Sequence, residues 1–295
     1  MKRSFPLVLA LALSPLSSGC SCGGPAPAPG NIDDLSVYFW DRYEPAPEAE
    51  RAAQETEIRL AVVALEETLN SLDRGGDDVE PVTFEAPFTG VLGTKLVEAQ
   101  VDTLKDVSPK FDKLPLAQGF VLGNISKCSQ QQNINMTMSN LGLQVHPDAY
   151  VAYDKRFDDS AADADAFAAG DSDFITWTTD YSIDSFPVKY DATITGAGRR
   201  VRGVEGEFPR DIFITRVYLQ NAEFDNDNSF DLDFQIEVYF ERDNGDLVHF
   251  YAMWRRMVIG GFSSSEGFFI DTTLNGFIDW EKENDEACES GLVDD

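Results

Sequence analysis

Histidines and cysteines, the side chains that most often carry catalysis and metal binding, are few in this 295-residue chain. The two histidines, His146 and His249, nearly exclude a metal site built from imidazole ligands. The sequence also lacks the HExxH, GxSxG, CxxC and phosphate-binding-loop motifs. A non-enzymatic protein is therefore favoured. A carboxylate-based hydrolase is an alternative, because acidic residues abound and two facing carboxylates can cleave a glycosidic bond.

One long strand carries the best candidates for ligand binding. Residues 247–259 (LVHFYAMWRRMVI) are apolar on both faces, so this strand is expected to lie deep in a sheet. Side chains alternate along a strand, so one face carries His249, Tyr251, Met253 and Arg255. A buried guanidinium must be paired, because an unpaired buried charge is very costly. Arg255 and His249 either hold the carboxylate or phosphate of a ligand in a cavity, or form internal ion pairs with acidic side chains.

An acidic stretch at residues 223–233 (EFDNDNSFDLD) has part of the spacing of a calcium-binding loop. Positions 1, 3, 7 and 9 of an EF-hand loop correspond to Asp225, Asp227, Asp231 and Asp233. Position 6 is phenylalanine instead of glycine, position 12 is isoleucine instead of glutamate, and the stretch leads into a strand. A Ca²⁺ site of another type is one interpretation, and an acidic turn followed by the solvent face of a strand is the alternative.

Basic residues cluster at only one place in this acidic chain. The cluster consists of Arg199, Arg200, Arg202 and Arg210. It either docks an anionic partner or forms a solvated loop.

The N-terminus has the pattern of an export signal. Two basic residues, Lys2 and Arg3, precede the apolar residues 5–16, which are too few to span a bilayer as a helix. Small residues follow this apolar stretch, as they do before a cleavage site. Residues 1–19 are therefore predicted to be a signal peptide.

Residues 17–20 (SSGC) resemble the lipobox of bacterial lipoproteins, with Ser17 in the place where leucine is usual. The resemblance implies cleavage before Cys20, acylation of Cys20 and anchoring in a membrane of the cell envelope. Ser21 follows in place of the aspartate that often signals inner-membrane retention, so the outer membrane is favoured. An ordinary signal peptide with a chance cysteine is the alternative.

The chain is expected to divide into four parts. Residues 20–46 would be the lipidated cysteine and its tether, since residues 23–30 (GGPAPAPG) form a stiff, solvated spacer. Residues 47–290 would form a single globular domain, and residues 291–295 an acidic tail.

A disulfide is expected between Cys128 and Cys288. Export would place both cysteines in an oxidising compartment, and both lie in the predicted domain. The bridge would close a loop of about 160 residues, and two isolated thiols are the alternative.

Composition limits the partners. A hydrophobic content of 43% and an aromatic content of 12% are typical of a folded protein. The net charge of −29 repels nucleic acid phosphates, so a nucleic-acid partner is not expected. The identity of a protein partner does not follow from the sequence.

Periodicity predicts few helices and many strands. A helical apolar stripe runs along residues 48–72, and a shorter helical pattern covers residues 273–287. The strongest hairpin signal is the turn at residues 243–246 (DNGD) between two long strands. Other segments are predicted as follows: strands at 82–92, 133–139, 175–183, 188–194, 212–219 and 268–271, a helix after the first of these, and a solvated loop at 154–173.

Strands at hairpin spacing with helices near both ends predict an α+β fold with a curved antiparallel sheet. Over residues 82–288 the order of elements resembles the START-like, or helix-grip, superfamily: a strand, one or two helices, an antiparallel sheet and a C-terminal helix gripped by it. The resemblance implies a cavity between sheet and helix that holds an apolar ligand. A lipocalin-like barrel is the alternative fold.

These observations predict a membrane-anchored lipoprotein of the bacterial envelope that binds an apolar or amphipathic small molecule. An envelope structural or adhesion lipoprotein that binds protein or polysaccharide is the alternative. No cofactor is expected apart from the possible Ca²⁺ of the acidic stretch.

Overall fold

A computed structural model describes residues 27–72, 87–105, 110–158, 161–185 and 188–294. The predicted signal peptide and Cys20 lie outside these residues. The helices are α1 (Ile32–Arg42), α2 (Glu48–Leu72), α3 (Glu98–Val101), α4 (Gln130–Met138), α5 (Gly142–Val145), α6 (Ala161–Ala169) and α7 (Gly267–Glu289), with 3₁₀ turns at Asp102–Leu104 and Phe111–Leu116. The strands are β1 (Phe88–Leu92), β2 (Gln118–Ser126), β3 (Ala152–Phe157), β4 (Phe174–Ser185), β5 (Val188–Val201), β6 (Ile212–Phe224), β7 (Ser229–Glu241), β8 (Leu247–Ile259) and β9 (Phe262–Ser263).

The described strands form one antiparallel sheet in the order β1-β2-β8-β7-β6-β5-β4-β3, and β9 pairs with β8. The order is an open path with β1 and β3 at its ends, which overturns the alternative of a lipocalin-like barrel for the described part of the chain. The predicted α+β class, with an antiparallel sheet, an N-terminal helix and a C-terminal closing helix, is confirmed.

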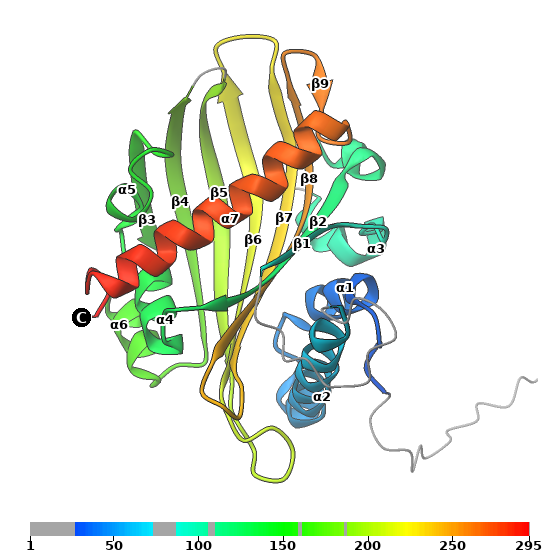
Figure 1. The fold of residues 1–295 in the computed structure, drawn as a ribbon, viewed down its shortest axis with the longest axis vertical. Helices are drawn as coiled ribbons and strands as arrows, with labels where there is room; N and C mark the ends of the chain where they lie inside the picture. The colour runs from blue at the N-terminus through cyan, green and yellow to red at the C-terminus, as the bar shows by residue number, and fades with distance from the viewer. Residues whose placement is uncertain (1–26, 73–86, 106–109, 159–160, 186–187, 295) are drawn as a thin grey trace, which may run out of the picture.

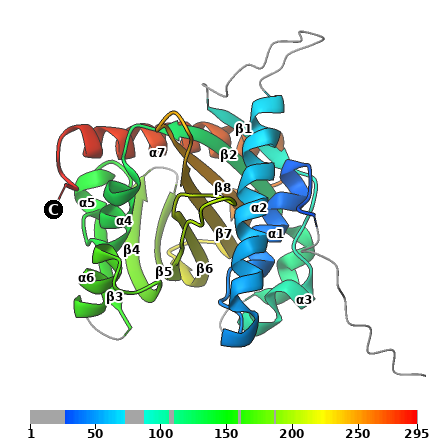
Figure 2. The same cartoon turned by 90° about the horizontal axis from the view of Figure 1, so that it is seen from below.

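Helices cover the two faces of the sheet. Helix α7 crosses one face diagonally, and α1 and α2 lie against the other face (Figures 1 and 2). In α1, the ring of Trp40 lies 5.6 Å from Phe234 and 6.1 Å from Trp254, measured between centroids. In α7, the ring of Phe277 lies 6.5 Å from Phe120 on the opposite face. None of the helices in the described ranges is long and apolar enough to cross a membrane.

Strand β8 lies inside the sheet between β2 and β7, as its two apolar faces predicted. Phe250, Ala252 and Trp254 are fully buried in the core shared with α1 and α2. Met253, on the other face, packs in the cluster that contains Phe277 of α7.

The strand–helix–sheet–helix order predicted from the sequence is present. Strand β2 is followed by the short helices α4 and α5, then by β3 to β8 and α7. Strand β1 lies within the strand predicted at 82–92, of which residues 82–86 lie outside the described residues, and it pairs with β2 at the edge of the sheet.

Three local predictions are wrong. All but the last of residues 133–139, predicted as a strand, belong to helix α4, because Ser129 and Gln132 form a reciprocal capping box that begins the helix. Residues 268–271 begin α7 rather than a strand. The predicted loop at 154–173 contains most of β3 and all of α6, whose Phe167 is fully buried.

The predicted boundaries of the tether and tail need correction. Helix α1 lies inside the range 20–46, and its Leu35, Phe39 and Trp40 recur at helical spacing and are buried in the core. The folded part therefore begins before residue 47. Val293, in the predicted acidic tail, is 1% exposed and packs beside the disulfide.

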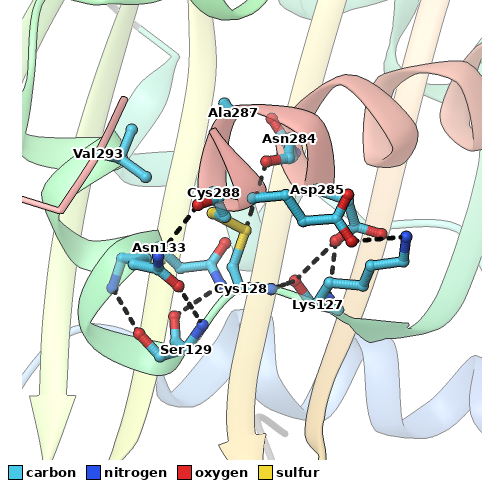
Figure 3. Close-up of a disulfide and its surroundings, with 12 residues drawn as sticks. Lys127, Cys128, Ser129, Asn133, Asn284, Asp285, Ala287, Cys288 and Val293 are labelled. Carbon is cyan, nitrogen blue, oxygen red and sulfur yellow. Dashed lines mark hydrogen bonds and ion pairs between the residues drawn. A yellow bond between two sulfur atoms is a disulfide. The ribbon is translucent and has the colours of Figure 1, made fainter. Parts of the chain in front are cut away.

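The predicted disulfide is confirmed. Cys128 and Cys288 are bonded with their Cα atoms 5.4 Å apart. The bond joins the segment before α4 to the last turn of α7 (Figure 3). Beside it, Asp285 of α7 accepts a hydrogen bond from the backbone N–H of Lys127 at 2.8 Å. The C-terminal end of α7 is thus held to the sheet by a covalent bond as well as by packing.

Candidate binding site between the sheet and helix α7

The four residues proposed for ligand binding share the β8 face that lies beneath α7. The ring of Tyr251 lies 4.9 Å from that of Phe277 in α7, and Met253 packs in the same cluster. His249 contacts the carboxylate of Glu281, which also belongs to α7. The predicted face is therefore brought together between sheet and helix.

Arg255 forms a bidentate ion pair with a buried aspartate. Its Nε and Nη2 lie 3.2 and 2.8 Å from the two carboxylate oxygens of Asp233, the residue directly opposite on β7. Gln235 donates to the same carboxylate at 2.5 Å, and the guanidinium lies 5.0 Å from the Phe230 ring. Burial by itself lowers the pKa of Arg255, but the Asp233 charge and hydrogen bonds outweigh burial and raise it. The ion-pair alternative is thus the one observed.

His249 lies between two carboxylates. Its Nδ1 is 2.9 Å from Glu281 Oε1, and its Nε2 is 3.1 Å from Glu237 Oε2. The His249 side chain is 4% exposed and that of Glu281 is 7% exposed, whereas the Glu237 side chain is 22% exposed. An imidazolium donates from both ring nitrogens, so the protonated ring satisfies both acids.

Within the triad of His249, Glu237 and Glu281, charge pairing shifts the pKa values of His249 and Glu237. Burial by itself lowers the pKa of His249, but the Glu281 charge and the hydrogen bonds that the ring donates to both carboxylates raise it to about 10. Burial raises the pKa of Glu237, and its contacts with His249, Tyr239 and Thr215 outweigh burial and lower it. The site therefore holds a protonated His249 and an ionised Glu237 at neutral pH.

Neighbouring side chains satisfy the remaining acceptors of the triad. The Tyr239 ring stacks on His249 with centroids 4.1 Å apart, and its hydroxyl donates to Glu237 at 2.5 Å. Thr215 donates to the other oxygen of Glu237 at 3.0 Å, and Asn124 donates to Glu281 at 3.2 Å. Glu237 and Glu281 thus converge on an imidazole and do not face each other across an open cleft, as a glycosidase pair does.

Aromatic rings form the wall beside Arg255. Tyr150 lies 5.3 Å from Tyr181 and 5.7 Å from Trp280 of α7, and Tyr181 lies 6.0 Å from Tyr190. Tyr190 in turn lies 5.8 Å from Phe230, the ring that contacts Arg255. Burial is the first cause of a raised pKa for Tyr150, Tyr181 and Tyr190, so their hydroxyls stay neutral. The wall combines apolar surface with hydroxyl groups.

Sequence reasoning missed the acids of α7 and β7 that complete this site. Glu281 lies four residues after Phe277, on the helix face that contacts the sheet. That spacing was a usable signal, because residues i and i+4 share a helix face. Glu237 lay on the polar face of its predicted strand, but its diagonal contact with His249 depends on the register of β7 against β8.

The four aspartates proposed for calcium do not come together. Asp231 pairs with Lys110 at 2.6 Å, and Asp233 with Arg255. Asp225 and Asp227 are exposed in the turn between β6 and β7. Within the ranges that the structure describes, no group of three or more His, Cys, Asp or Glu side chains is arranged to hold a metal ion.

A separate hollow of about 520 Å³ lies over β3 to β6. Its walls include Asp154, Asp180, Asp191 and Glu223. Tyr181 also lines the hollow, but its ring packs with Tyr150 on the α7 side, so by strand alternation these acids face away from that helix. An acidic wall does not suit an apolar ligand, so we place the candidate site beneath α7.

Comparison with solved structures finds similar folds at low sequence identity. A STAR-related lipid transfer protein from Xanthomonas axonopodis is 9% identical, with a TM-score of 0.37 over 59% of this chain and 85% of that chain. Ara h 8.0201 is 6% identical, with a TM-score of 0.36 over 59% of this chain and 99% of that chain. A protein from Chromobacterium violaceum is 9% identical, with a TM-score of 0.31 over 58% and 96%. No protein-family model and no curated protein matches the sequence.

Proposed function

We propose that this chain is a non-enzymatic binding protein that holds an amphipathic small molecule between its sheet and helix α7. The observation that carries the proposal is Arg255, whose side chain is 23% exposed beneath α7 while its partner Asp233 is 2% exposed. The pair uses Nε and Nη2, and a guanidinium has five N–H donors. Donors outside this pair therefore suit the polar group of a ligand, and the Tyr150 and Tyr251 rings suit its apolar part.

We also propose that the protein is anchored to the bacterial envelope through acylated Cys20, with the outer membrane as its location. The support is the signal-peptide pattern and the lipobox-like residues 17–20. Residues 21–30 would then separate the lipid from helix α1, where the folded part begins. More than one acyl chain is needed for stable anchoring, which the two acylation positions of such a cysteine would supply.

Ligand binding is tested by native mass spectrometry on the protein purified from an exporting host, followed by organic extraction. We expect a discrete co-purifying amphipathic molecule or saturable uptake of an added fatty acid. Tyr150→Ala is expected to weaken the uptake about tenfold, since aromatic residues in a binding site dominate its energetics. Phe262→Ala is the matched control, because this aromatic residue of β9 is 53% exposed and lies outside the candidate site.

A clean apo mass without uptake of fatty acids would overturn the carrier function. That result would favour the alternative of an envelope protein that presents its surface to a protein or polysaccharide. Equal loss of uptake in Tyr150→Ala and Phe262→Ala would move the binding site away from α7.

Anchoring is tested by metabolic labelling with a palmitate analogue. Cys20→Ser is expected to abolish the label and to release the protein from the membrane fraction, because the thiol and the processed N-terminus are both lost. Cys22→Ser, two residues away, should keep the label. Label retained in Cys20→Ser would contradict the lipobox interpretation.

A further inference from the structure

A second cavity, of about 270 Å³, lies between the first turns of α2 and the adjoining ends of β4 and β5. Its walls include Pro45, Arg51, Glu55, Phe174 and Arg199. The cavity is separate from the candidate site beneath α7, because Arg199 contacts the C-terminal end of α1 on the other face of the sheet. Two members of the basic cluster seen in the sequence, Arg199 and Arg200, lie on β5 and are 2% and 7% exposed. The other two, Arg202 and Arg210, lie in the connection between β5 and β6, as the solvated-loop alternative has it for Arg202, whose side chain is 44% exposed.

Arg199 presents an unused donor to this cavity. Its Nη1 donates to the backbone carbonyls of Arg42 and Tyr43, both at 2.9 Å, which fixes the guanidinium in place. Its buried Nη2 forms an ion pair with Glu55 Oε1 at 3.8 Å, which is too long for a hydrogen bond, and has no hydrogen-bond partner among the described residues. A buried N–H without an acceptor is unfavourable. An acceptor atom of a molecule bound in the cavity would satisfy this N–H.

Positive charge is in excess around the cavity. Arg51 is exposed at its mouth, one helical turn before Glu55 on α2. The pKa of Arg199 is lowered, chiefly because the side chain is buried. Glu55 and Tyr43 oppose this shift, and the positive charge of Arg51 adds to it. The cavity wall also includes Arg200 and Asp173, and the Asp173 carboxylate is paired with Arg202 at 2.7 Å. An anion between Arg51 and Arg199 would relieve the repulsion of the two guanidinium groups.

We propose that this cavity binds a small organic oxyanion. The carboxylate or phosphate group of the oxyanion accepts hydrogen bonds from Nη2 of Arg199 and pairs with Arg51. A guanidinium suits both groups, because its planar fork matches their oxygens. Phe174 and Pro45 contact the apolar part of the molecule.

The test is calorimetric titration of the purified protein at low ionic strength with inorganic phosphate, acetate and benzoate, against chloride as background. We expect saturable binding of one molecule per chain, with benzoate tighter than acetate because of the apolar wall. Phosphate binding with carboxylates at background would assign the site to phosphate groups, and the reverse would assign it to carboxylates. Background signal for all three anions would overturn the proposal.

Two variants at exposed or half-exposed helix positions keep the test specific. Arg51→Ala is expected to weaken binding about fivefold through loss of one ion pair, whereas Glu55→Gln should strengthen it by removing a competing acid. Arg156→Ala, an exposed arginine on β3, is the matched control and should bind like the wild type. Unchanged binding in Arg51→Ala would also overturn the proposal. Tyr150→Ala should leave anion binding unchanged, which separates this site from the one beneath α7.

Discussion

Replacing both Cys128 and Cys288 by serine is expected to lower the free energy of unfolding by about 5 kcal/mol, less any strain in the bridge. The bonded residues are 160 positions apart, so the bridge removes much of the conformational freedom of the unfolded chain. The second consequence is local. The bridge holds the last turn of α7, the helix that covers the candidate site, so its loss should also weaken ligand uptake.

Urea unfolding of the double variant, followed by tryptophan fluorescence, measures the change. Wild-type protein treated with a reductant gives the same comparison without a substitution, which covers the case in which the variant fails to fold. Cys22→Ser is the control, because Cys22 lies outside the described fold. A loss below about 1 kcal/mol would show that packing alone holds α7 in place, against the loop-entropy argument.

Replacing His249 by alanine is expected to destabilise the fold by about 3–5 kcal/mol, the typical cost of removing one partner from a buried ion pair. The variant leaves the Glu281 carboxylate, which is 7% exposed, next to Glu237 without the cation between them. The stacking of Tyr239 on the imidazole is lost as well. Lys189→Ala is the control, because it removes an exposed partner of Asp184 and exposed pairs contribute little.

The same triad predicts how stability depends on pH. The pKa of His249 rises from 6.5 to about 10 on folding, so its contribution is complete below pH 6.5 and is lost as pH rises towards 10. The pKa of Glu237 is lowered from 4.5, so its contribution is present above pH 4.5 and is lost as pH falls below that value. His249 and Glu237 therefore stabilise the fold most between pH 4.5 and pH 6.5.

Urea midpoints measured from pH 4 to pH 10 test this dependence. The wild type should lose stability between pH 7 and pH 10, and His249→Gln, which keeps the shape but cannot gain a proton, should lose much less. Parallel pH curves for the two proteins would contradict the assignment of a protonated imidazole between the two acids.

Local pattern was sufficient for several features of this fold. The alternation along residues 247–259 predicted that His249, Tyr251, Met253 and Arg255 share a face, because the side-chain period of a strand is a property of the backbone alone. The disulfide was predictable since only Cys128 and Cys288 lie within the expected domain. The α+β class followed from strands at hairpin spacing and from helical periodicity, which are local signals.

Tertiary structure decided which acids meet which cations. Asp233 pairs with Arg255 because the register of β7 places them opposite each other, and Glu281 reaches His249 only because α7 crosses the sheet at that point. A bulge between Phe230 and Leu232 shifts that register. It puts Phe230 on the α7 face, although strict alternation predicted it on the same face as Leu232.

The sequence by itself determined the α+β class, the bridged cysteines and the face of β8, since each depends on nearby residues or on residue type. It did not determine that α1 belongs to the core, because an aromatic, acidic segment after a Pro-rich stretch has the composition of either a docking element or a tether. The contacts of Trp40 in α1 with Phe234 of β7 and Trp254 of β8 show that α1 belongs to the core. Pairing over long sequence separations depends on register and helix placement, which only the folded chain specifies.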